Sequence, residues 1–153
     1  MSSENSLEKI KKLREITGVG FKDCKIALDE NKGDIEKSIE FLRKKGIAKA
    51  SKRMEKTAAE GLVCIYENKN KFSMIEVNSE TDFVAKNKEF INFAKEVSDI
   101  SLISSGVIET ILNSKMINNK SVEENLVLLV AKIGEKITLR RSTHIGGDKS
   151  FNF

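Results

Sequence analysis

The spacing of apolar residues changes from a helical period to a strand-like period near Gly61. Before this point apolar residues recur every three or four positions, as they do on one face of a helix. After it, Leu62–Tyr66 and Phe72–Val77 flank the polar stretch Asn68–Lys71, which is the pattern of a β-hairpin. Ile137–Arg141 alternates again and predicts a third, half-buried strand. A helical start followed by strands and further helices favours an α+β fold, with helices packed on one face of a small antiparallel sheet.

The N-terminal part of the chain is predicted to form three short helices around a small core. We expect Ser6 to cap the first helix and the glycines of Thr17–Gly20 to end it. A second helix is expected over Phe21–Asn31. Asp34 is expected to cap the third helix and Gly46 to end it. The apolar faces that should pack together are Leu7, Ile10 and Leu13, then Cys24, Ala27 and Leu28, then Ile35, Ile39 and Leu42.

The chain is expected to divide into a three-helix domain over 1–46, a basic helical linker over 47–57, an α+β core over 58–145 and a tail over 146–153. The cations in and before the linker are Arg43, Lys44, Lys45, Lys49, Lys52, Arg53 and Lys56. Such a run is usually a solvated connector. A nucleic-acid surface is the alternative, although the run lacks the interleaved aromatic residues that stack on bases. The formal net charge of +4 allows an acidic partner without requiring nucleic acid.

The core is expected to contain two amphipathic helices and a shorter one. The first carries the apolar stripe Phe90, Phe93, Ala94, Val97 and Ile100. Ser104–Gly106 interrupts it, and Val107–Leu112 is expected to form the short helix. Ser121 and Glu124 have the spacing of a capping box, which opens a helix that Gly134 closes. Its core face is expected to be Leu126, Leu129, Val130 and Ile133.

The residues that catalysis would need are few. His144 is the chain's one histidine, and no carboxylate or cysteine lies beside it in the sequence. Cys24 and Cys64 fall on different predicted elements and lack the spacing of metal ligands. Phosphate-binding loops of the GxxxxGK[ST] or GxGxxG type do not occur. We therefore expect a binding or regulatory protein, not an enzyme, without a metal or cofactor of its own.

Cellular location is indicated only by what the sequence lacks. No apolar run approaches the length of a membrane span, and the first residues have neither a signal-peptide core nor the character of a transit peptide. Two cysteines do not make a disulfide framework. These features together predict a cytoplasmic protein with reduced thiols and no membrane partner.

The stretch Thr81–Asn87 joins the end of the predicted hairpin to the helix that begins near Lys88. One interpretation is a helix cap, in which Thr81 or Asp82 accepts hydrogen bonds from free N–H groups and Phe83 and Val84 lie in the core. The other is that a short acid and a large aromatic side chain are presented to a partner at a rigid corner. These seven residues alone favour the first interpretation.

Two segments resemble the signatures of the elongation factor Ts family. Leu13–Leu28 contains Leu-Arg, Thr-Gly-Val-Gly and Asp-Cys-Lys in the family's order, and Gly33–Ile35 matches the Gly-Asp-Ile that follows. Glu76–Asn87, with Thr-Asp-Phe-Val-Ala at its centre, resembles the second signature. Leu129–Glu135 is a third match. In this order the matches are specific, and they cover about residues 7 to 145.

The resemblance implies a guanine-nucleotide exchange factor for elongation factor Tu that does not itself bind the nucleotide. The three N-terminal helices would be a ubiquitin-associated-like domain that touches the partner's nucleotide-binding domain. Asp82 and Phe83 would enter the partner near its magnesium and nucleotide pocket. The residues implied in contact are Thr81, Asp82, Phe83 and Val84 at the junction, Arg14, Val19, Gly20, Phe21, Lys22 and Lys25 in the N-terminal domain, and Ile133 in the core.

The chain also departs from the family pattern. Members usually continue beyond the position of Arg141 into a second core subdomain, so this chain is expected to be a short form or a fragment. The positions of Phe21 and Lys22 are often both apolar in the family, which suggests a partly electrostatic contact here. Two other classes stay open: a ribosome- or RNA-associated basic protein that uses residues 43–56, and an inactive fragment that folds only as a small α+β module.

Overall fold

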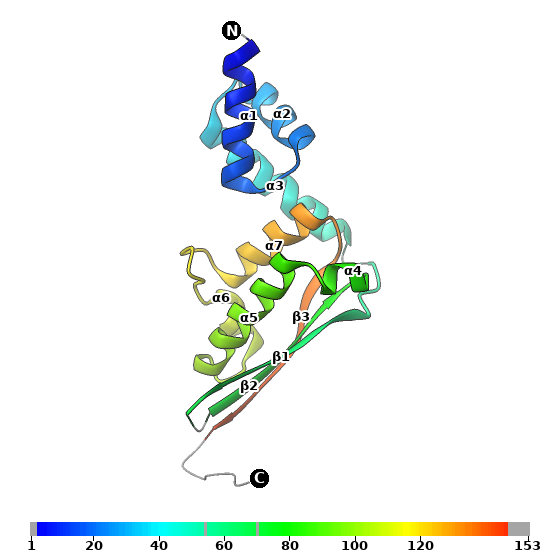
Figure 1. The fold of residues 1–153 in the computed structure, drawn as a ribbon, viewed down its shortest axis with the longest axis vertical. Coiled ribbons are helices and arrows are strands. Elements are labelled where there is room, and N and C mark those ends of the chain that lie inside the picture. Colours follow the sequence, from blue (N-terminus) through cyan, green and yellow to red (C-terminus); the bar gives the residue numbers. More distant parts are fainter. Residues whose placement is uncertain (1–2, 54, 70, 147–153) are drawn as a thin grey trace.

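The structure is a computed structural model that describes residues 3–53, 55–69 and 71–146 (Figure 1). The predicted tail therefore lies, apart from Gly146, outside the described residues. The elements in chain order are α1 (Ser3–Thr17), α2 (Phe21–Glu30), α3 (Ile35–Arg53), β1 (Glu60–Asn68), β2 (Lys71–Ser79), α4 (Asp82–Ala85), α5 (Lys88–Ile103), α6 (Ile108–Asn113), α7 (Val122–Ile133) and β3 (Ile137–Gly146). Helices α1, α2 and α3 lie at one end of an elongated molecule, and the sheet with its helices lies at the other.

The N-terminal helices pack around a core of their own. Its buried apolar residues are Ile10, Leu13, Val19, Cys24, Ala27, Leu28 and Leu42. The predicted cap at Asp34 is confirmed, because its Oδ1 accepts a hydrogen bond of 3.0 Å from the backbone N–H of Lys37. The predicted cap at Ser6 is wrong: α1 already begins at Ser3. Leu7, expected on the buried face, is 50% exposed.

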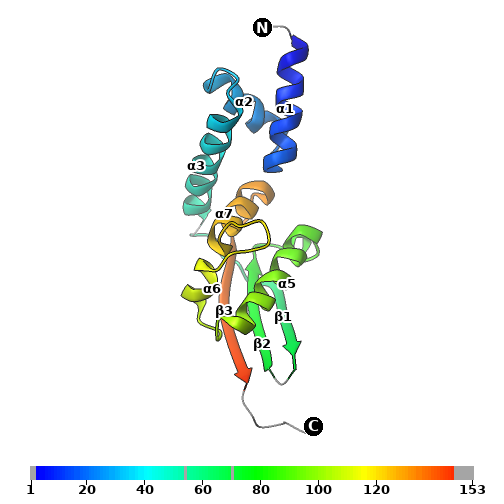
Figure 2. The ribbon, with the colours of Figure 1, turned by 90° about the vertical axis from the view of Figure 1, so that its left-hand side faces the viewer.

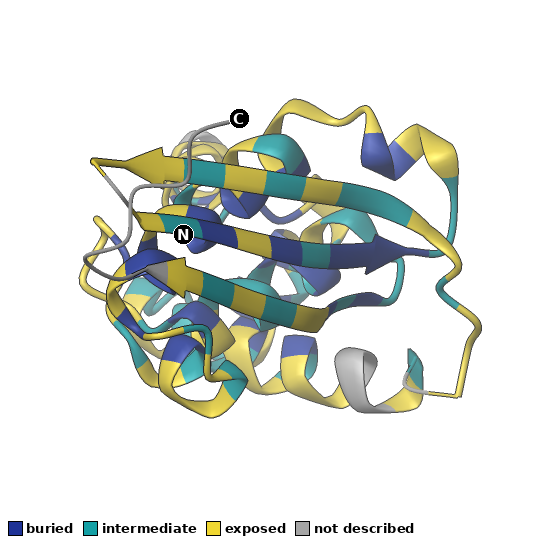
Figure 3. Cartoon of the chain, turned by 90° about the horizontal axis from the view of Figure 1, so that it is seen from below, coloured by how far each residue is buried: buried dark blue, intermediate teal, exposed yellow. Residues whose placement is uncertain are grey.

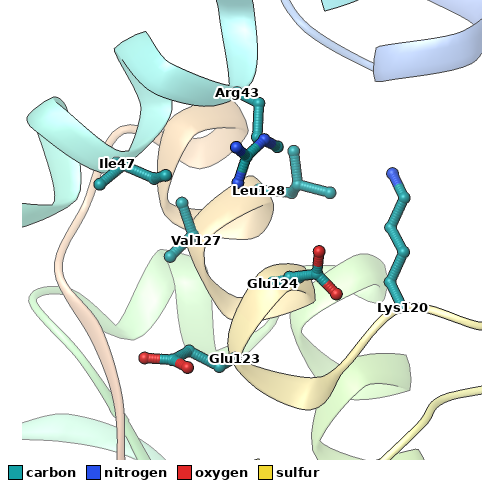
Figure 4. A pocket seen from close by; sticks show the side chains of 7 residues that line it. All are labelled: Arg43, Ile47, Lys120, Glu123, Glu124, Val127 and Leu128. Atoms are coloured by element: carbon teal, nitrogen blue, oxygen red, sulfur yellow. The ribbon is translucent and has the colours of Figure 1, made fainter. Parts of the chain in front are cut away.

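Gly46 does not end the third helix, contrary to the prediction. Helix α3 runs through it to Arg53. A Cβ atom at Gly46 would lie 2.9 Å from the Cβ atom of Ala131 on α7. The missing side chain thus lets α3 and α7 pass close together, and this packing outweighs the low helix propensity of glycine. Beside the contact lies a groove of about 300 Å³ (Figure 4), lined by Arg43, Ile47, Lys120, Glu123, Glu124, Val127 and Leu128.

Replacing Gly46 by leucine is expected to destabilise the chain by about 1–3 kcal/mol, the usual cost of overpacking a close contact. The added side chain would meet a methyl group on a helix, which cannot swing aside as a long side chain can. Urea denaturation followed by far-UV circular dichroism measures the effect. An additional Ala131→Gly substitution should restore part of the loss. Equal stability of the wild type and the Gly46→Leu variant would contradict this account of the contact.

The three strands form one antiparallel sheet in the order β1-β2-β3. Cys64 pairs with Ile75, and Ile75 pairs with Ser142 on β3. A register shift between Glu76 and Val77 interrupts the second ladder. The central strand carries most of the buried positions, whereas the edge strand β1 alternates between half-buried and exposed residues (Figure 3). Helix α5 packs on one face of the sheet, so the predicted α+β fold is confirmed (Figure 2).

The predicted core helices are confirmed in position and orientation. Phe90, Phe93, Ala94, Val97 and Ile100 of α5 are all buried. At the start of α7, Ser121 Oγ accepts from the backbone N–H of Glu124 at 3.1 Å, and Glu124 Oε2 accepts from the N–H of Ser121 at 2.8 Å. Gly134 ends α7 with a φ of 83°, a left-handed conformation that glycine adopts without strain. These ends fix where the loop after α7 reaches the sheet.

Candidate partner-binding site

The segment Thr81–Ala85, called the α4 corner below, turns the chain from the end of β2 toward α5. Val84 and Ala85 are buried, with exposed fractions of 6% and 8%. Phe83 points the other way and is 79% exposed. The interpretation that places both Phe83 and Val84 in the core is therefore correct for Val84 and wrong for Phe83. Within the single turn of α4, Val84 and Ala85 are thus packed in the core, while the ring of Phe83 projects into solvent.

Thr81 occupies the N-cap position of α4, but its side chain does not cap the helix. Its hydroxyl donates to Glu135 Oε1 at 2.7 Å, and its backbone N–H donates to Glu135 Oε2 at 3.0 Å. The cap of the following helix is Asn87, whose side chain accepts from the N–H groups of Glu89 and Phe90. The predicted cap is thus displaced to Asn87, and Thr81 joins the corner to the loop after α7.

Asp82 is an exposed carboxylate beside the projecting ring. Lys86 Nζ donates to Asp82 Oδ2 at 2.7 Å. This hydrogen bond and the charge of Lys86 lower the pKa of Asp82 below its usual value. Asp82 therefore carries a negative charge at neutral pH. It is next to the exposed ring of Phe83 in the sequence and is paired with Lys86.

The residues predicted for contact in the N-terminal helices lie around the start of α2. Gly20, Lys22 and Lys25 are exposed, as is Arg14 near the end of α1. Phe21 is 45% exposed. Phe21 and Lys25 stand one helical turn apart and share a face of α2. Phe21 is thus an exposed apolar side chain on a face of α2 that also carries the cation Lys25.

Val19 has a different position from the other five. It is 6% exposed and belongs to the core of the three helices. Its carbonyl oxygen accepts a hydrogen bond from Cys24 Sγ at 3.4 Å. Val19 is thus placed to hold the loop before Phe21 in shape.

Ile133 is the last residue of α7 and is half-buried against the core. Its neighbour Lys132 donates to Glu89 at 2.5 Å and also lies beneath Gly18, where an added Cβ atom would be 2.7 Å from the ammonium nitrogen. Lys132 and Arg14 line one shallow pocket. Because Glu135 holds Thr81 two residues further on, the α4 corner, Ile133 and the loop after α1 all lie at the same end of the core.

Residues 80–153 match the family model described as Elongation factor TS. Over this range the chain belongs to the elongation factor Ts family. The match supports the role of a translation elongation factor. The matched range begins just before the α4 corner and includes Ile133. The match assigns no role to single residues, so the contacts predicted for Thr81, Asp82, Phe83, Val84 and Ile133 stay predictions. The N-terminal helices lie outside the match, and the contacts of Arg14, Val19, Gly20, Phe21, Lys22 and Lys25 stay predictions of the sequence resemblance as well.

Two glutamates that support the corner of this elongation factor Ts chain were missed by the sequence analysis. Glu135 binds Thr81 as described, and Glu80 accepts from the backbone N–H of Lys136 at 2.6 Å and from Arg53 Nη1 at 3.0 Å. Both residues are far from their partners in the sequence, and a glutamate in a polar loop has no period or spacing that reveals its partner. Only the return of the chain after α7 brings them together.

Groups suited to chemistry are sparse in the described part of the chain. Residues 3–53, 55–69 and 71–146 contain no cluster of three histidine, cysteine or acidic side chains placed to hold a metal ion. Burial raises the pKa of the Cys24 thiol and of the Cys64 thiol, which disfavours the reactive thiolate. Among these residues, no helix is both long and apolar enough to cross a membrane.

The stability of the chain is expected to fall as the pH drops from about 5 to 3, in part through Glu80. The hydrogen bond from the N–H of Lys136 lowers the pKa of Glu80 in the folded chain, with a smaller contribution from Arg53. The folded chain thus binds the proton less tightly than the unfolded chain. The stabilising effect of the ionised Glu80 is complete at pH values above the pKa of Glu80 in the unfolded chain. It is lost as the pH falls through the pKa of Glu80 in the folded chain.

Urea denaturation midpoints across this pH range test the expectation. Glu80→Gln keeps an acceptor for Lys136 but does not titrate, so its midpoint should vary less with pH than that of the wild type. Glu109→Gln, at an exposed position of α6, is the control and should follow the wild type. Parallel curves for Glu80→Gln and the wild type would refute the contribution assigned to Glu80.

Proposed function

We propose that this chain is a guanine-nucleotide exchange factor that binds elongation factor Tu with bound GDP and promotes release of the GDP. The observation that carries the proposal is the 79% exposed Phe83 on a corner whose next two residues are buried. An exposed phenylalanine ring does not gain the free energy that burial of its apolar surface would give, so it adds nothing to the folding of the free chain. Large aromatic side chains are frequent anchors of protein interfaces. A fixed, projecting ring is thus suited to enter a partner surface.

Exchange of this kind requires no catalytic group on the factor. GDP is held in a GTPase by backbone N–H donors around its phosphates and by a magnesium ion. A factor that binds the nucleotide-free GTPase more tightly than the GDP-bound one weakens GDP binding by the same ratio, because the coupling is reciprocal. In our proposal Phe83 displaces partner side chains and helices, and the carboxylate of Asp82 disturbs the magnesium site indirectly. The chain has no nucleotide site of its own in this scheme.

A second contact by the N-terminal helices would hold the partner while the corner acts. The proposal assigns this contact to Arg14, Gly20, Phe21, Lys22 and Lys25, with Val19 shaping the loop from within. Ile133, at the same end of the core as the corner, would add apolar contact. Its position beside Lys132 connects both regions, since Lys132 lies under the loop after α1. A partner that covers this end of the core and the adjoining loop after α1 would touch all three regions.

The test is the rate of GDP release from purified elongation factor Tu, followed with a fluorescent GDP analogue and an excess of unlabelled nucleotide. The wild-type chain should accelerate release, and the Asp82→Ala/Phe83→Ala variant should lose most of that acceleration. Both changed residues are exposed, so the variant should remain folded. Equal release rates with and without the wild-type chain would rule the proposal out.

The alternative of an RNA-binding surface on α3 is weakened by the ion pairs there. Lys45 donates to Asp23 at 2.9 Å, Arg53 to Glu80 at 3.0 Å and Arg43 to Glu40 at 2.8 Å. Cations held by carboxylates on the same chain attract phosphates less. RNA binding that weakens steeply with salt and is unaffected by Phe83→Ala would favour the alternative.

A further inference from the structure

The last pair of the β2–β3 ladder is Ser79 with Ile137, and the next residues on each side are joined by side chains. Glu80, which follows β2, accepts from the backbone N–H of Lys136 at 2.6 Å. Glu135 lies just before Lys136 on the β3 side and accepts from the backbone N–H and the hydroxyl of Thr81. The two carboxylates therefore extend the contact between the strands beyond the end of the ladder. Glu80 on the β2 side binds the β3 side, and Glu135 on the β3 side binds the β2 side. We call Glu80 and Glu135, with the groups they bind, the carboxylate brace.

The brace holds the residue on which the α4 corner begins. Thr81 directly precedes Asp82, and two further hydrogen bonds to its carbonyl oxygen hold it in place. Ser79 Oγ donates to the carbonyl oxygen of Thr81 at 2.9 Å, and that oxygen also accepts from the N–H of Ala85. A four-residue helix cannot keep its direction by its own hydrogen bonds. The direction of Phe83 must therefore come from Val84 in the core on one side and from Thr81 in the brace on the other.

The brace also reaches the N-terminal helices. Arg53 is the last residue of α3, and its Nη1 donates to the same Glu80 oxygen that accepts from Lys136. The side chain of Glu80 is 19% exposed, so this ion pair is partly shielded from solvent. Helix α3 is continuous from the N-terminal domain to this point. One carboxylate thus joins the α4 corner, the loop after α7 and the helix that carries the other proposed contact.

We infer that Glu80 and Glu135 are positioning residues for nucleotide exchange: they fix the direction in which Phe83 projects without touching the partner. This inference rests on the proposed exchange function. Loosening the brace leaves the ring exposed and available for binding, but no longer directed. The partner is then bound nearly as well through the N-terminal helices, while fewer encounters displace the nucleotide. The maximal rate of release falls more than the half-saturating concentration of the factor changes.

The experiment measures GDP release from elongation factor Tu over a range of factor concentrations for full-length variants. Glu135→Ala is expected to lower the maximal rate about tenfold, the change expected when hydrogen bonds to a charged group are lost. Glu135→Gln keeps one acceptor oxygen, so its maximal rate should lie between those of the wild type and Glu135→Ala. It serves as the test if Glu135→Ala does not fold. Glu40→Gln, an ion-paired glutamate on α3 away from the brace, is the matched control and should behave as wild type.

Two readouts separate positioning from a general loss of structure. In the Phe83→Ala background, Glu135→Ala should cause no further loss, because both changes act through the same ring. In the free factor, amide hydrogen exchange at Thr81 should accelerate in Glu135→Ala, while that of Val97 in the core stays slow. An undiminished maximal rate in Glu135→Ala, or an equal further loss in the Phe83→Ala background, overturns the positioning role. A wild type that does not accelerate release overturns the proposed function and this inference with it.

Discussion

Phe83→Ala is expected to reduce the acceleration of GDP release about 30-fold or more, the effect of removing an interface residue worth at least about 2 kcal/mol. The ring is 79% exposed in the free chain, so its removal leaves no cavity and should not lower the melting temperature. The loss should appear mainly in the maximal rate, since the N-terminal helices still bind the partner. Stopped-flow release of a fluorescent GDP analogue, together with thermal unfolding of the same sample, measures both quantities.

Ile103→Ala is the matched control for this prediction. Ile103 is 83% exposed and ends α5, the helix that starts at Lys88 beside the corner. At the rise of an α-helix, its position is about 22 Å further along. The substitution removes a comparable exposed apolar side chain away from the proposed contact and should not change the release rate. Equal losses for Ile103→Ala and Phe83→Ala would show that any exposed apolar residue serves and that the corner has no special role.

Elements whose signals are local could be predicted from the sequence. The apolar stripe of α5 fixes both its existence and its buried face, and the capping box of Ser121 and Glu124 marks the start of α7 within one residue. The alternation of β1 and β2 around a polar turn gives the hairpin. In each of these the pattern lies within one or two elements, so no knowledge of distant contacts is needed.

Features that depend on distant contacts could not be predicted. Gly46 looks like a helix end, but Ala131 on another element makes a glycine favourable there. Thr81 looks like a cap, but its partner is Glu135, 54 positions later in the chain. In the single turn of α4 there is no period to decide which of Phe83 and Val84 faces the core. The resemblance indicated which residues matter at this site, but the direction of the ring and the bonds that hold it required the structure.

Phe90→Ala is expected to lower the free energy of unfolding by about 3–5 kcal/mol, the usual cost of truncating a buried phenylalanine. Phe90 is 0% exposed, lies in the first turn of α5 and packs in the same core cluster as Val84. A loss of this size is a large share of the roughly 5–15 kcal/mol that holds a domain folded. Urea denaturation at equilibrium measures it. Phe90→Leu keeps most of the volume and should cost about 1.5 kcal/mol or less.

The two phenylalanines then give opposite results, and the contrast separates folding from exchange. At a temperature where Phe90→Ala is still folded, its rate of GDP release per folded molecule should fall far less than that of Phe83→Ala, since the projecting ring is intact. Phe83→Ala should keep its stability and lose its rate. If Phe90→Ala instead loses the rate as fully as Phe83→Ala while folded, the direction of the ring depends on packing beneath the corner more than on the carboxylate brace. If Phe90→Ala were as stable as the wild type, the position of Phe90 in the core would be wrong. Removing a side chain that is 0% exposed from a closely packed interior must leave a cavity.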